Sequence, residues 1–344
     1  MPSDPAPPEA ASALAARTRY GPLVLLLLFA ATFPEVLSGS TPVPELLAHP
    51  SGFLLLLGLY GGGAVLVWEA LARWRKGWLA VVPWGLAYGI AEEGLATKTF
   101  TDPHQQFAIT GIPGAYGNLG GVEWVTVAGI DPFHAAVSIG LELLLIALLF
   151  PRLKGRSIVS DRALAIVGLA FAATVTLMFF TVDPDPLGPL AVPLVGFALL
   201  GVGLIVAGCR LPDGALAGWM RAPTPAASPR AFFAVAFGWL LALLVLFQIG
   251  SHLLPWAGIL ILLFVASGAL SLGFLLTRSG WRENRPHQVA FVGGFAGAFV
   301  VWDVLLEALG DVGVLAFTAV FVALVVWIQR HPEGLGARGD DPGR

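Results

Sequence analysis

The amino-acid sequence predicts an all-α membrane protein, a polytopic bundle of about ten transmembrane helices. Of its 344 residues, 57% are hydrophobic and only 12% are charged, whereas a soluble domain carries roughly 25% charged residues. Apolar stretches of about 20 residues recur along the chain, the length that crosses roughly 30 Å of hydrocarbon at 1.5 Å per residue. The lipid bilayer of the cell membrane is therefore the first expected partner.

Charge and cysteine content argue against other classes of protein. The net charge is −3, and no basic block is present that could neutralise a row of phosphates, so nucleic-acid binding is not expected. The single cysteine, Cys209, excludes an internal disulfide framework and a cysteine-rich metal site. The sequence names no cofactor.

The spans follow one another with turn-forming breakers between them. The first is expected to be retained, because Phe33-Pro34-Glu35 at its end offers no small-residue cleavage site for a signal peptide. Residues 1–19 and 331–344 are expected to be disordered tails on either side of the 20–330 bundle. The predicted spans are 21–38, 52–72, 78–97, 131–150, 162–182, 188–209, 231–253, 256–277, 288–309 and 312–329.

Lysine and arginine in short connections mark the cytoplasmic side of a membrane protein. Here they occur before the first span and after every second one, while the intervening connections carry mainly acids. Lys98 is the one basic residue that departs from this alternation. The pattern predicts that the N- and C-termini are both cytoplasmic.

The connection after the third span, residues 98–130, is unusually long and rich in glycine and aromatic residues. Loops of this length are usually functional or disordered, and the aromatic content argues against disorder. We expect it to cover the outer face as a lid or re-entrant segment. Asp131-Pro132 resembles an N-cap followed by proline at the first helical position, which predicts that the fourth span begins there. Asp102-Pro103 predicts a short surface helix in the same way.

Ionisable side chains within spans are costly in hydrocarbon, so each is a candidate functional residue. Glu92 and Glu93 lie about 7 to 8 Å below the outer end of the third span, and His134 falls in the same layer of the fourth. The spacing of the polar residues of the fourth span predicts one stripe on a helix, formed by Asp131, His134, Ser138 and Glu142. On the third span, Tyr88 and Glu92 share one stripe, and Gly85, Gly89 and Glu93 form a neighbouring one that permits close helix contact.

Other spans contribute polar groups near the same side. Together they predict an outward-facing polar cavity built from spans 1, 3, 4, 7 and 9 and capped by the long loop. For Glu35, His252 and Glu307 a position at the water interface explains the residue equally well, and Glu69 is expected to pair with Arg73 one turn away. The further candidate binding or relay residues are Glu35, Trp124, Gln248, Ser251, His252, Trp302, Asp303 and Glu307.

Two adjacent glutamates and a histidine form a minimal acid–base set. One carboxylate can take a proton from water, while the imidazole orients that water or stabilises an oxyanion. Glu92, Glu93 and His134 are therefore the candidate catalytic residues of an intramembrane hydrolase or protease.

A helical Glu-Glu pair followed by a histidine-bearing helix resembles the glutamic intramembrane proteases of the CAAX-protease and bacteriocin-processing superfamily. The resemblance covers residues 92–134 and implies a proteolytic role for Glu92, Glu93 and His134. The sequence departs from the family in the arginine expected after the Glu-Glu pair, where Ala96 and Thr97 are followed by Lys98. The segments around Glu92, Phe100-Thr101-Asp102-Pro103 and Phe133-His134 are also similar to an uncharacterised group of prokaryotic multi-pass membrane proteins.

Three alternatives remain open on sequence alone. Glu92, Glu93, His134, Glu142 and Asp303 descend toward the middle of the membrane, as in a proton- or cation-coupled transporter. The sequence supports the transporter nearly as well as a hydrolase that acts on a membrane peptide. His134 and the carboxylates are also plausible metal ligands, but they lack the spacing of a strong motif such as HExxH, and no metal is assigned. The last alternative is a non-catalytic sensor or assembly subunit.

Overall fold

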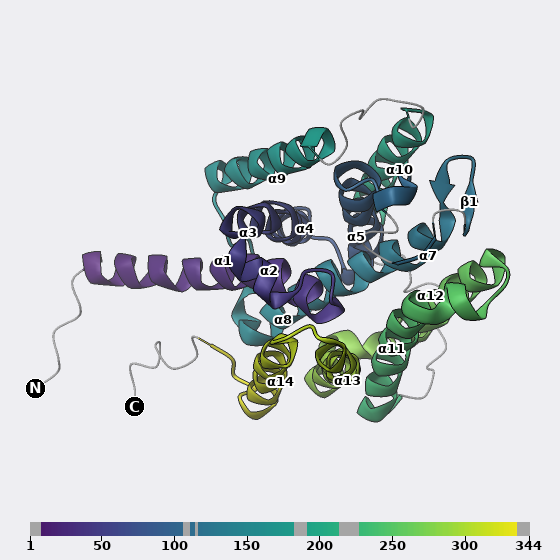
Figure 1. Cartoon of the computed structure of the whole chain (residues 1–344). Helices are drawn as coiled ribbons and strands as arrows, with labels where there is room; N and C mark the ends of the chain where they lie inside the picture. The colour runs from purple at the N-terminus through teal and green to yellow at the C-terminus, as the bar shows by residue number, and fades with distance from the viewer. Residues whose placement is uncertain (1–7, 106–110, 114–115, 182–190, 213–226, 336–344) are drawn as a thin grey trace, which may run out of the picture.

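The computed structural model describes residues 8–105, 111–113, 116–181, 191–212 and 227–335, and nearly all of them are helical (Figure 1). Within this part of the chain, eight helices are long and apolar enough to cross a membrane. Two further helical segments, 78–96 and α14, lie where the third and tenth spans are predicted. The predicted helical bundle of about ten spans is therefore confirmed as a fold class.

The first half of the chain contains the most interrupted helices. Three of its spans change to a wider π-helical form part of the way along, and these π-helical segments are η1, η3 and η4. In chain order the elements are α1 (Pro8–Ser38), α2 (Val43–Ala48), α3 (Pro50–Leu56), η1 (Leu57–Gly61), α4 (Gly62–Arg73), η2 (Trp78–Ala80), α5 (Val81–Gly89), η3 (Ile90–Ala96), β1 (Asn118–Leu119), β2 (Val122–Glu123), α7 (Trp124–Phe133), η4 (His134–Leu141), α8 (Glu142–Leu149) and η5 (Pro151–Leu153).

The second half consists mainly of uninterrupted helices, and α11 to α14 lie together in the green to yellow part of Figure 1. Helix α11 packs along α13, which in turn packs on α14. The elements are α9 (Asp161–Thr181), α10 (Ala191–Arg210), α11 (Pro229–Leu253), α12 (Ala257–Thr277), η6 (Ser279–Glu283), α13 (Arg285–Leu309) and α14 (Val314–Arg330).

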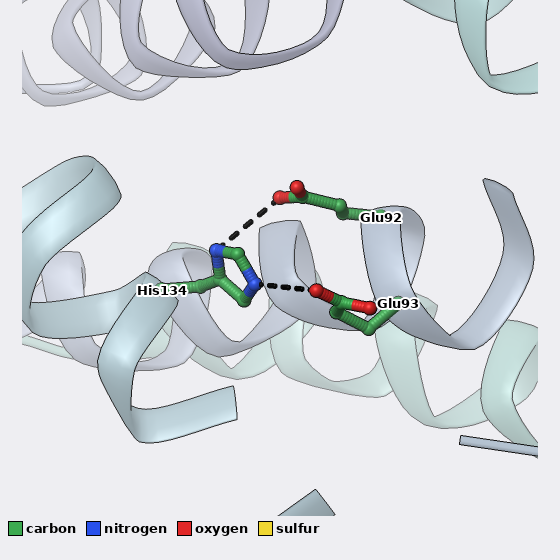
Figure 2. Close-up of side chains that lie close together, drawn as sticks. All are labelled: Glu92, Glu93 and His134. Atoms are coloured by element: carbon green, nitrogen blue, oxygen red, sulfur yellow. Dashed lines mark hydrogen bonds and ion pairs between the residues drawn. The ribbon is translucent and has the colours of Figure 1, made fainter. Parts of the chain in front are cut away.

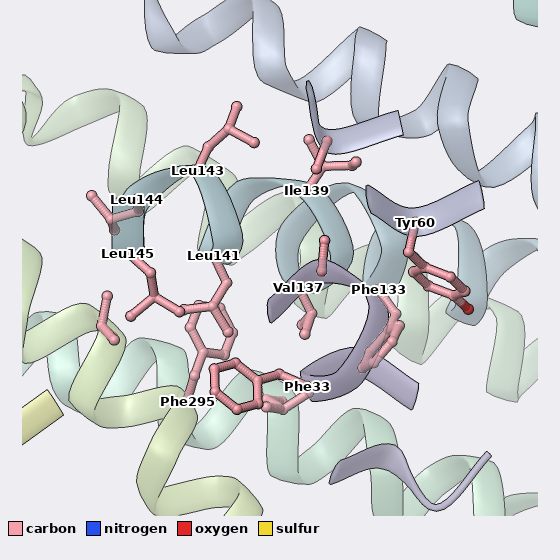
Figure 3. Packing of buried hydrophobic residues seen from close by; sticks show 14 of the residues in the cluster. Phe33, Tyr60, Phe133, Val137, Ile139, Leu141, Leu143, Leu144, Leu145 and Phe295 are labelled. Carbon is pink, nitrogen blue, oxygen red and sulfur yellow. The ribbon is translucent and has the colours of Figure 1, made fainter. Parts of the chain in front are cut away.

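The helix formed by α7, η4 and α8 is the most buried of the eight candidate spans. Every residue from Leu141 to Leu149 is buried. Figure 3 shows the first part of this run, with Leu141, Leu143, Leu144 and Leu145, beside Phe33 of α1 and Phe295 of α13. Apolar side chains on all sides of a helix are typical of a position in the core of a membrane bundle. The fourth span therefore forms the centre of the fold, and its polar residues face protein.

The predicted basic connections meet at one end of the bundle. Arg73 pairs with Glu69, Nε–Oε2 2.6 Å, as the sequence predicts, and also with Asp161 at the start of α9. Lys76 donates to the carbonyl of Leu211, and Lys154 donates to that of Arg282. These contacts join connections that are far apart in the sequence, as the predicted alternation requires. We refer to this end as the basic end.

One predicted span boundary is wrong, and so is part of the predicted N-terminal tail. Residues 8–19 are helical and not disordered, because the alanine-rich stretch before Arg17 has high helix propensity and continues into the first span. The part of α1 that is apolar and long enough to cross a membrane is Tyr20–Ser38, in agreement with the predicted span 21–38. The fourth span begins at Trp124 and not at Asp131, so Asp131 and Pro132 lie inside the helix. Proline lacks the N–H that would bond the carbonyl four residues earlier, and the chain becomes π-helical two residues later, at His134.

The described parts of the long connection fold onto the end of the bundle opposite the basic end. Lys98, Thr99 and Phe100 are fully buried, and the Lys98 ammonium lies 4.4 Å from the centre of the Phe179 ring. Strands β1 and β2 form a short antiparallel hairpin, whose Glu123 N–H donates to the carbonyl of Phe100 at 2.9 Å. Residues 106–110 and 114–115 of the predicted lid lie outside the described residues.

Two further predictions, a helix start at Asp102 and a C-terminal tail, can be compared with the structure. The carboxylate of Asp102 accepts the N–H of His104 at 2.8 Å, and residues 103–105 are helical, so the predicted helix start is confirmed. Leu335, in the predicted C-terminal tail, donates its N–H to the carbonyl of Leu149 at 2.7 Å. The rest of that tail, 336–344, and residues 1–7 lie beyond the described part of the chain.

Candidate functional site

Glu92, Glu93 and His134 come together in the interior (Figure 2). The imidazole lies between the two carboxylates, with Nε2 3.0 Å from Glu93 Oε1 and Nδ1 3.2 Å from Glu92 Oε2. All three residues are at most 5% exposed. Carboxylates in such surroundings are costly unless a cation or hydrogen-bond donors compensate them, and the imidazole is placed to compensate both.

Glu93 is held in place by several donors. Its Oε1 faces His134, while Oε2 accepts hydrogen bonds from the hydroxyls of Thr97, at 2.9 Å, and Thr99. The two threonines belong to the turn that follows η3, where Lys98 adopts a left-handed backbone conformation with φ 62°. The start of the long connection therefore fixes the orientation of Glu93.

Glu92 is less constrained than Glu93. His134 Nδ1 lies 3.0 Å from Ser138 Oγ in hydrogen-bond geometry. The same nitrogen lies 3.2 Å from Glu92 Oε2, but these two atoms do not form a hydrogen bond. Among the described residues, Glu92 Oε2 has no hydrogen-bond partner. Glu92 therefore has fewer hydrogen-bond partners than Glu93, and its side chain lines the cavity described below.

The three π-helical segments carry the cluster and the side chains next to it. Tyr60 lies on η1, Glu92 and Glu93 on η3, and His134 with Ser138 on η4. A π-helical insertion widens the turn and is frequent at functional sites. Here it turns polar side chains from three separate spans toward one point.

A second group adjoins the first. Glu35 of α1 accepts hydrogen bonds from the hydroxyl of Tyr60 and, at 2.5 Å, from that of Thr41. The rings of Tyr60 and Tyr88 lie 6.0 and 5.8 Å from the His134 ring. Sequence reasoning missed Tyr60 and Thr41. Tyr60 is one of only four tyrosines and precedes the three glycines 61–63, a signal that could have indicated it.

A cavity of about 290 Å³ opens beside the cluster. It lies among α1, η1, η3, α7 with η4, α11 and α13, so spans 1, 3, 4, 7 and 9 line it as expected, and spans 2 and 5 contribute as well. Its wall combines the polar side chains of the cluster with apolar side chains, several of them from α11. The lining residues include Glu35, Ser38, Ser40, Thr41, Tyr60, Glu92, Glu93, Thr97, Phe133, His134, Met178, Leu243, Leu244, Phe247, Gln248 and Trp302.

Tyr88, Asp131 and Ser138 border the cluster without lining the cavity. Gly89 of α5 approaches α7 and η4 so closely that a Cβ there would lie 2.3 Å from Asp131 Oδ1 and 3.2 Å from His134 Cβ. Gly85 meets the backbone of Ala135 in the same way. The predicted close contact along the glycine stripe is confirmed, and it places the third span directly against the fourth.

Six of the candidate residues lie elsewhere, and one of them is Ser251, which lies near the end of α11 and does not line the cavity. Trp124 is 42% exposed and donates to the carbonyl of Leu119, and His252 is exposed at the end of α11. Asp303 is buried and accepts the hydroxyl of Thr318 at 2.5 Å, which joins α13 to α14. Glu142 is fully buried, and within the described chain its carboxyl has no hydrogen-bond partner. The wider turns of η4 shift the register of the predicted stripe, so Glu142 does not reach the cavity.

Glu307, the last of these residues, has a structural role. Its carboxylate accepts the N–H groups of Gly313, at 3.0 and 3.1 Å, and of Leu315, at 3.2 Å. These donors belong to the start of α14, where the backbone N–H groups have no partner inside the helix. Glu307 therefore acts as the N-terminal cap of α14.

Replacing Glu307 with alanine is expected to lower the free energy of unfolding by about 1 kcal/mol, the usual effect of removing a cap. The measurement is the unfolding of the detergent-solubilised protein by urea, and the exposed Glu283→Ala variant at the basic end is the matched control. An unfolding midpoint equal to that of the control would show that the cap contributes nothing.

The cluster could also hold a metal ion. Glu92, Glu93 and His134 each offer one ligand atom, and these atoms lie within 4.8 Å of one another. Carboxylate oxygens and an imidazole nitrogen suit zinc and related divalent metals. Thr97 and Thr99 would then orient the ligand Glu93 from outside the coordination sphere, as hydrogen-bonded partners of metal ligands commonly do.

Comparison with known proteins gives one match. A family model described as "Uncharacterized membrane protein family" matches residues 24–330, which includes all of the cluster and the cavity. No curated protein and no solved structure matches the chain. The match agrees with the predicted likeness to uncharacterised multi-pass membrane proteins, whereas the resemblance to glutamic proteases is not confirmed.

Proposed function

The chain belongs to this uncharacterized membrane protein family, and from that premise we propose that it is an intramembrane hydrolase in which Glu92 activates water. The observation that carries the proposal is the geometry of Glu92. Its carboxylate lies on a buried cavity beside His134, and Oε2 is without a hydrogen-bond partner among the described residues. A general base needs this combination of access and a neighbouring group that orients it.

The reaction would proceed as a general-base hydrolysis. Glu92 accepts a proton from a water molecule in the cavity, and the resulting hydroxide attacks the carbonyl carbon of an ester or amide. The same proton then passes from Glu92 to the leaving group. His134, held between the carboxylates, keeps Glu92 in position and offsets negative charge that develops on the substrate oxygen. Glu93, fixed by Thr97 and Thr99, in turn positions His134.

The mixed wall of the cavity supports a substrate that enters from the membrane. Leu243, Leu244 and Phe247 of α11 line the same cavity as the polar cluster. A membrane peptide, or another amphipathic molecule, would place its apolar part against α11 and its polar bond near Glu92. Because the basic end lies opposite and basic loops favour the cytoplasm, the proposed site opens toward the outside of the cell membrane.

A proton- or cation-coupled transporter is the second candidate, and Glu142 favours it. A buried carboxyl of this kind, roughly 12 Å along the helix from His134, is typical of a proton relay. However, the residues that follow it to Leu149 are all apolar and buried, and Figure 3 shows Leu143, Leu144 and Leu145 among them. No polar side chain of the described residues continues the path by a hydrogen bond to Glu142, which supports hydrolysis over transport.

One experiment separates the two functions. The purified protein is reconstituted in proteoliposomes with a panel of transmembrane peptides, in water enriched in ¹⁸O. Hydrolysis is expected to yield a cleaved peptide whose new carboxylate carries ¹⁸O, at the same rate in a Glu142→Gln variant. No cleavage of any peptide, together with a pH-dependent flux that Glu142→Gln alters, would contradict the hydrolase and favour transport.

A further inference from the structure

A second, larger cavity lies away from the polar cluster, on the side of the central helix that faces α12. It has a volume of about 350 Å³ and is bounded by α5, by α7 with η4, and by α11 and α12. Figure 1 shows α7 between α5 and α12, and α7 contacts both of them. We call this cavity the apolar groove.

The walls of the groove are almost entirely apolar. Small residues line one side, among them Ala136 and Gly140 of η4 and Gly268 and Ala269 of α12, with larger aliphatic side chains between them. Phe264 closes one end by stacking on Phe247, 4.8 Å between ring centres, and Phe247 in turn lines the polar cavity. The groove and the catalytic cavity are therefore neighbours that are separated by an aromatic pair.

The other end of the groove is cationic and aromatic. Trp78, Trp281 and Arg282 line it, at the end of the bundle where the basic connections meet. The side chains of Lys154 and Gln288 donate hydrogen bonds to the backbone carbonyl of Arg282. The nearby Glu283 forms an ion pair with Lys154, with Nζ and Oε2 3.6 Å apart. The Glu283 carboxylate also interacts electrostatically with Arg282, but among the described residues no carboxylate forms an ion pair with the Arg282 guanidinium, so the guanidinium can bind an anion.

The length of the groove matches one leaflet of a bilayer. Along α12 it extends from Phe264 to Leu276, which is about 18 Å at 1.5 Å per residue. Half of the hydrocarbon core measures roughly 15 Å. Tryptophan is enriched where hydrocarbon meets the headgroups, and both Trp78 and Trp281 lie at the cationic end. The groove thus runs from a headgroup layer to the middle of the membrane.

We propose that the apolar groove binds one acyl chain of an anionic phospholipid, with the lipid phosphate at Arg282. The charge of Arg282 and the tryptophans beside it select the headgroup, while the small residues of η4 and α12 leave room for the chain. Basic pockets between transmembrane helices are known to bind anionic headgroups in this way. The site is independent of the proposed hydrolysis, because no residue of the Glu92 cluster lines the groove.

The test uses the full-length protein in detergent and native mass spectrometry, with titrations of phosphatidylglycerol and phosphatidylcholine. The wild type is expected to bind phosphatidylglycerol more tightly. Arg282→Gln should weaken that binding about fivefold, the effect of roughly one cation near a headgroup, and leave phosphatidylcholine unchanged. Arg278→Gln is the matched control, because Arg278 lies at the same end but does not line the groove.

A second variant fills the groove. A Cβ at Gly268 would have its nearest neighbour, Trp239 Nε1, at 3.9 Å, so Gly268→Leu fits and occupies the space of the acyl chain. Binding of both lipids should then be lost. Gly273→Leu is the control, because Gly273 lies on the same helix with no atom within 4 Å of a built Cβ and is not a lining residue.

Several outcomes would overturn the proposal. Equal affinity of the wild type for the two lipids would contradict the proposal that Arg282 selects an anionic headgroup. Wild-type binding of phosphatidylglycerol by Gly268→Leu would show that the lipid lies elsewhere. A dimer that Gly268→Leu alone disrupts would assign the groove to a second copy of the chain.

Discussion

Replacing Glu92 with glutamine is expected to lower the rate of hydrolysis about 10²- to 10⁴-fold, the usual contribution of a general base. Glutamine has the shape of glutamate but cannot accept the proton of the attacking water. The side chain is buried beside His134, and its Oε2 contacts the imidazole without a hydrogen bond, so an amide of the same size can take its place. The measurement is the single-turnover rate of cleavage in proteoliposomes.

Glu142→Gln is the matched control for this result. Glu142 is a fully buried glutamate on the same central helix as His134, but it does not line the cavity. The substitution therefore removes a carboxylate of similar burial from outside the proposed site. A loss of activity in both variants, or in neither, would argue against a catalytic role for Glu92. Unfolding midpoints measured beside the rates would show whether either variant disturbs the fold.

Much of the fold could be predicted from the sequence because the membrane imposes simple rules. Apolar stretches of sufficient length predicted the ten helical segments, and the depths of Glu92, Glu93 and His134 predicted that these side chains share a layer. The glycines of α5 predicted the close packing against the fourth span, which the approach of Gly85 to Ala135 confirms. These inferences depend on length, depth and helical periodicity, which can be counted along the chain.

The features that could not be predicted depend on the local backbone conformation, which the sequence does not reveal. The π-helical turns of η3 and η4 change which residues share a face, so they align Glu93 with His134 and move Glu142 away. Asp131-Pro132 has the composition of a helix start, but contacts of the preceding hairpin extend the helix back to Trp124. Asp303 and Glu307 were equally plausible as site residues, because a buried acid bonded to a neighbouring helix looks the same in sequence as a functional one.

Removal of the imidazole is expected to have the largest effect on stability. His134→Ala leaves Glu92 and Glu93 buried with no cation between them, and breaking a buried ion pair from one side costs about 3 to 5 kcal/mol. Both carboxylates lie within 3.2 Å of a ring nitrogen, so both lose their partner at once. Unfolding of the detergent-solubilised protein by urea measures the loss.

The double variant His134→Ala with Glu92→Gln distinguishes lost charge compensation from lost packing. If the two uncompensated carboxylates cause the destabilisation, removing one of them restores part of the free energy of unfolding, and the two substitutions are not additive. If the cause is the space left by the ring, the double variant is no more stable than His134→Ala. His252→Ala is the control, because His252 is exposed and its loss should change stability by no more than about 0.5 kcal/mol. A His134→Ala variant as stable as that control would mean that the imidazole does not compensate the buried acids, which would remove the electrostatic basis of the proposed site.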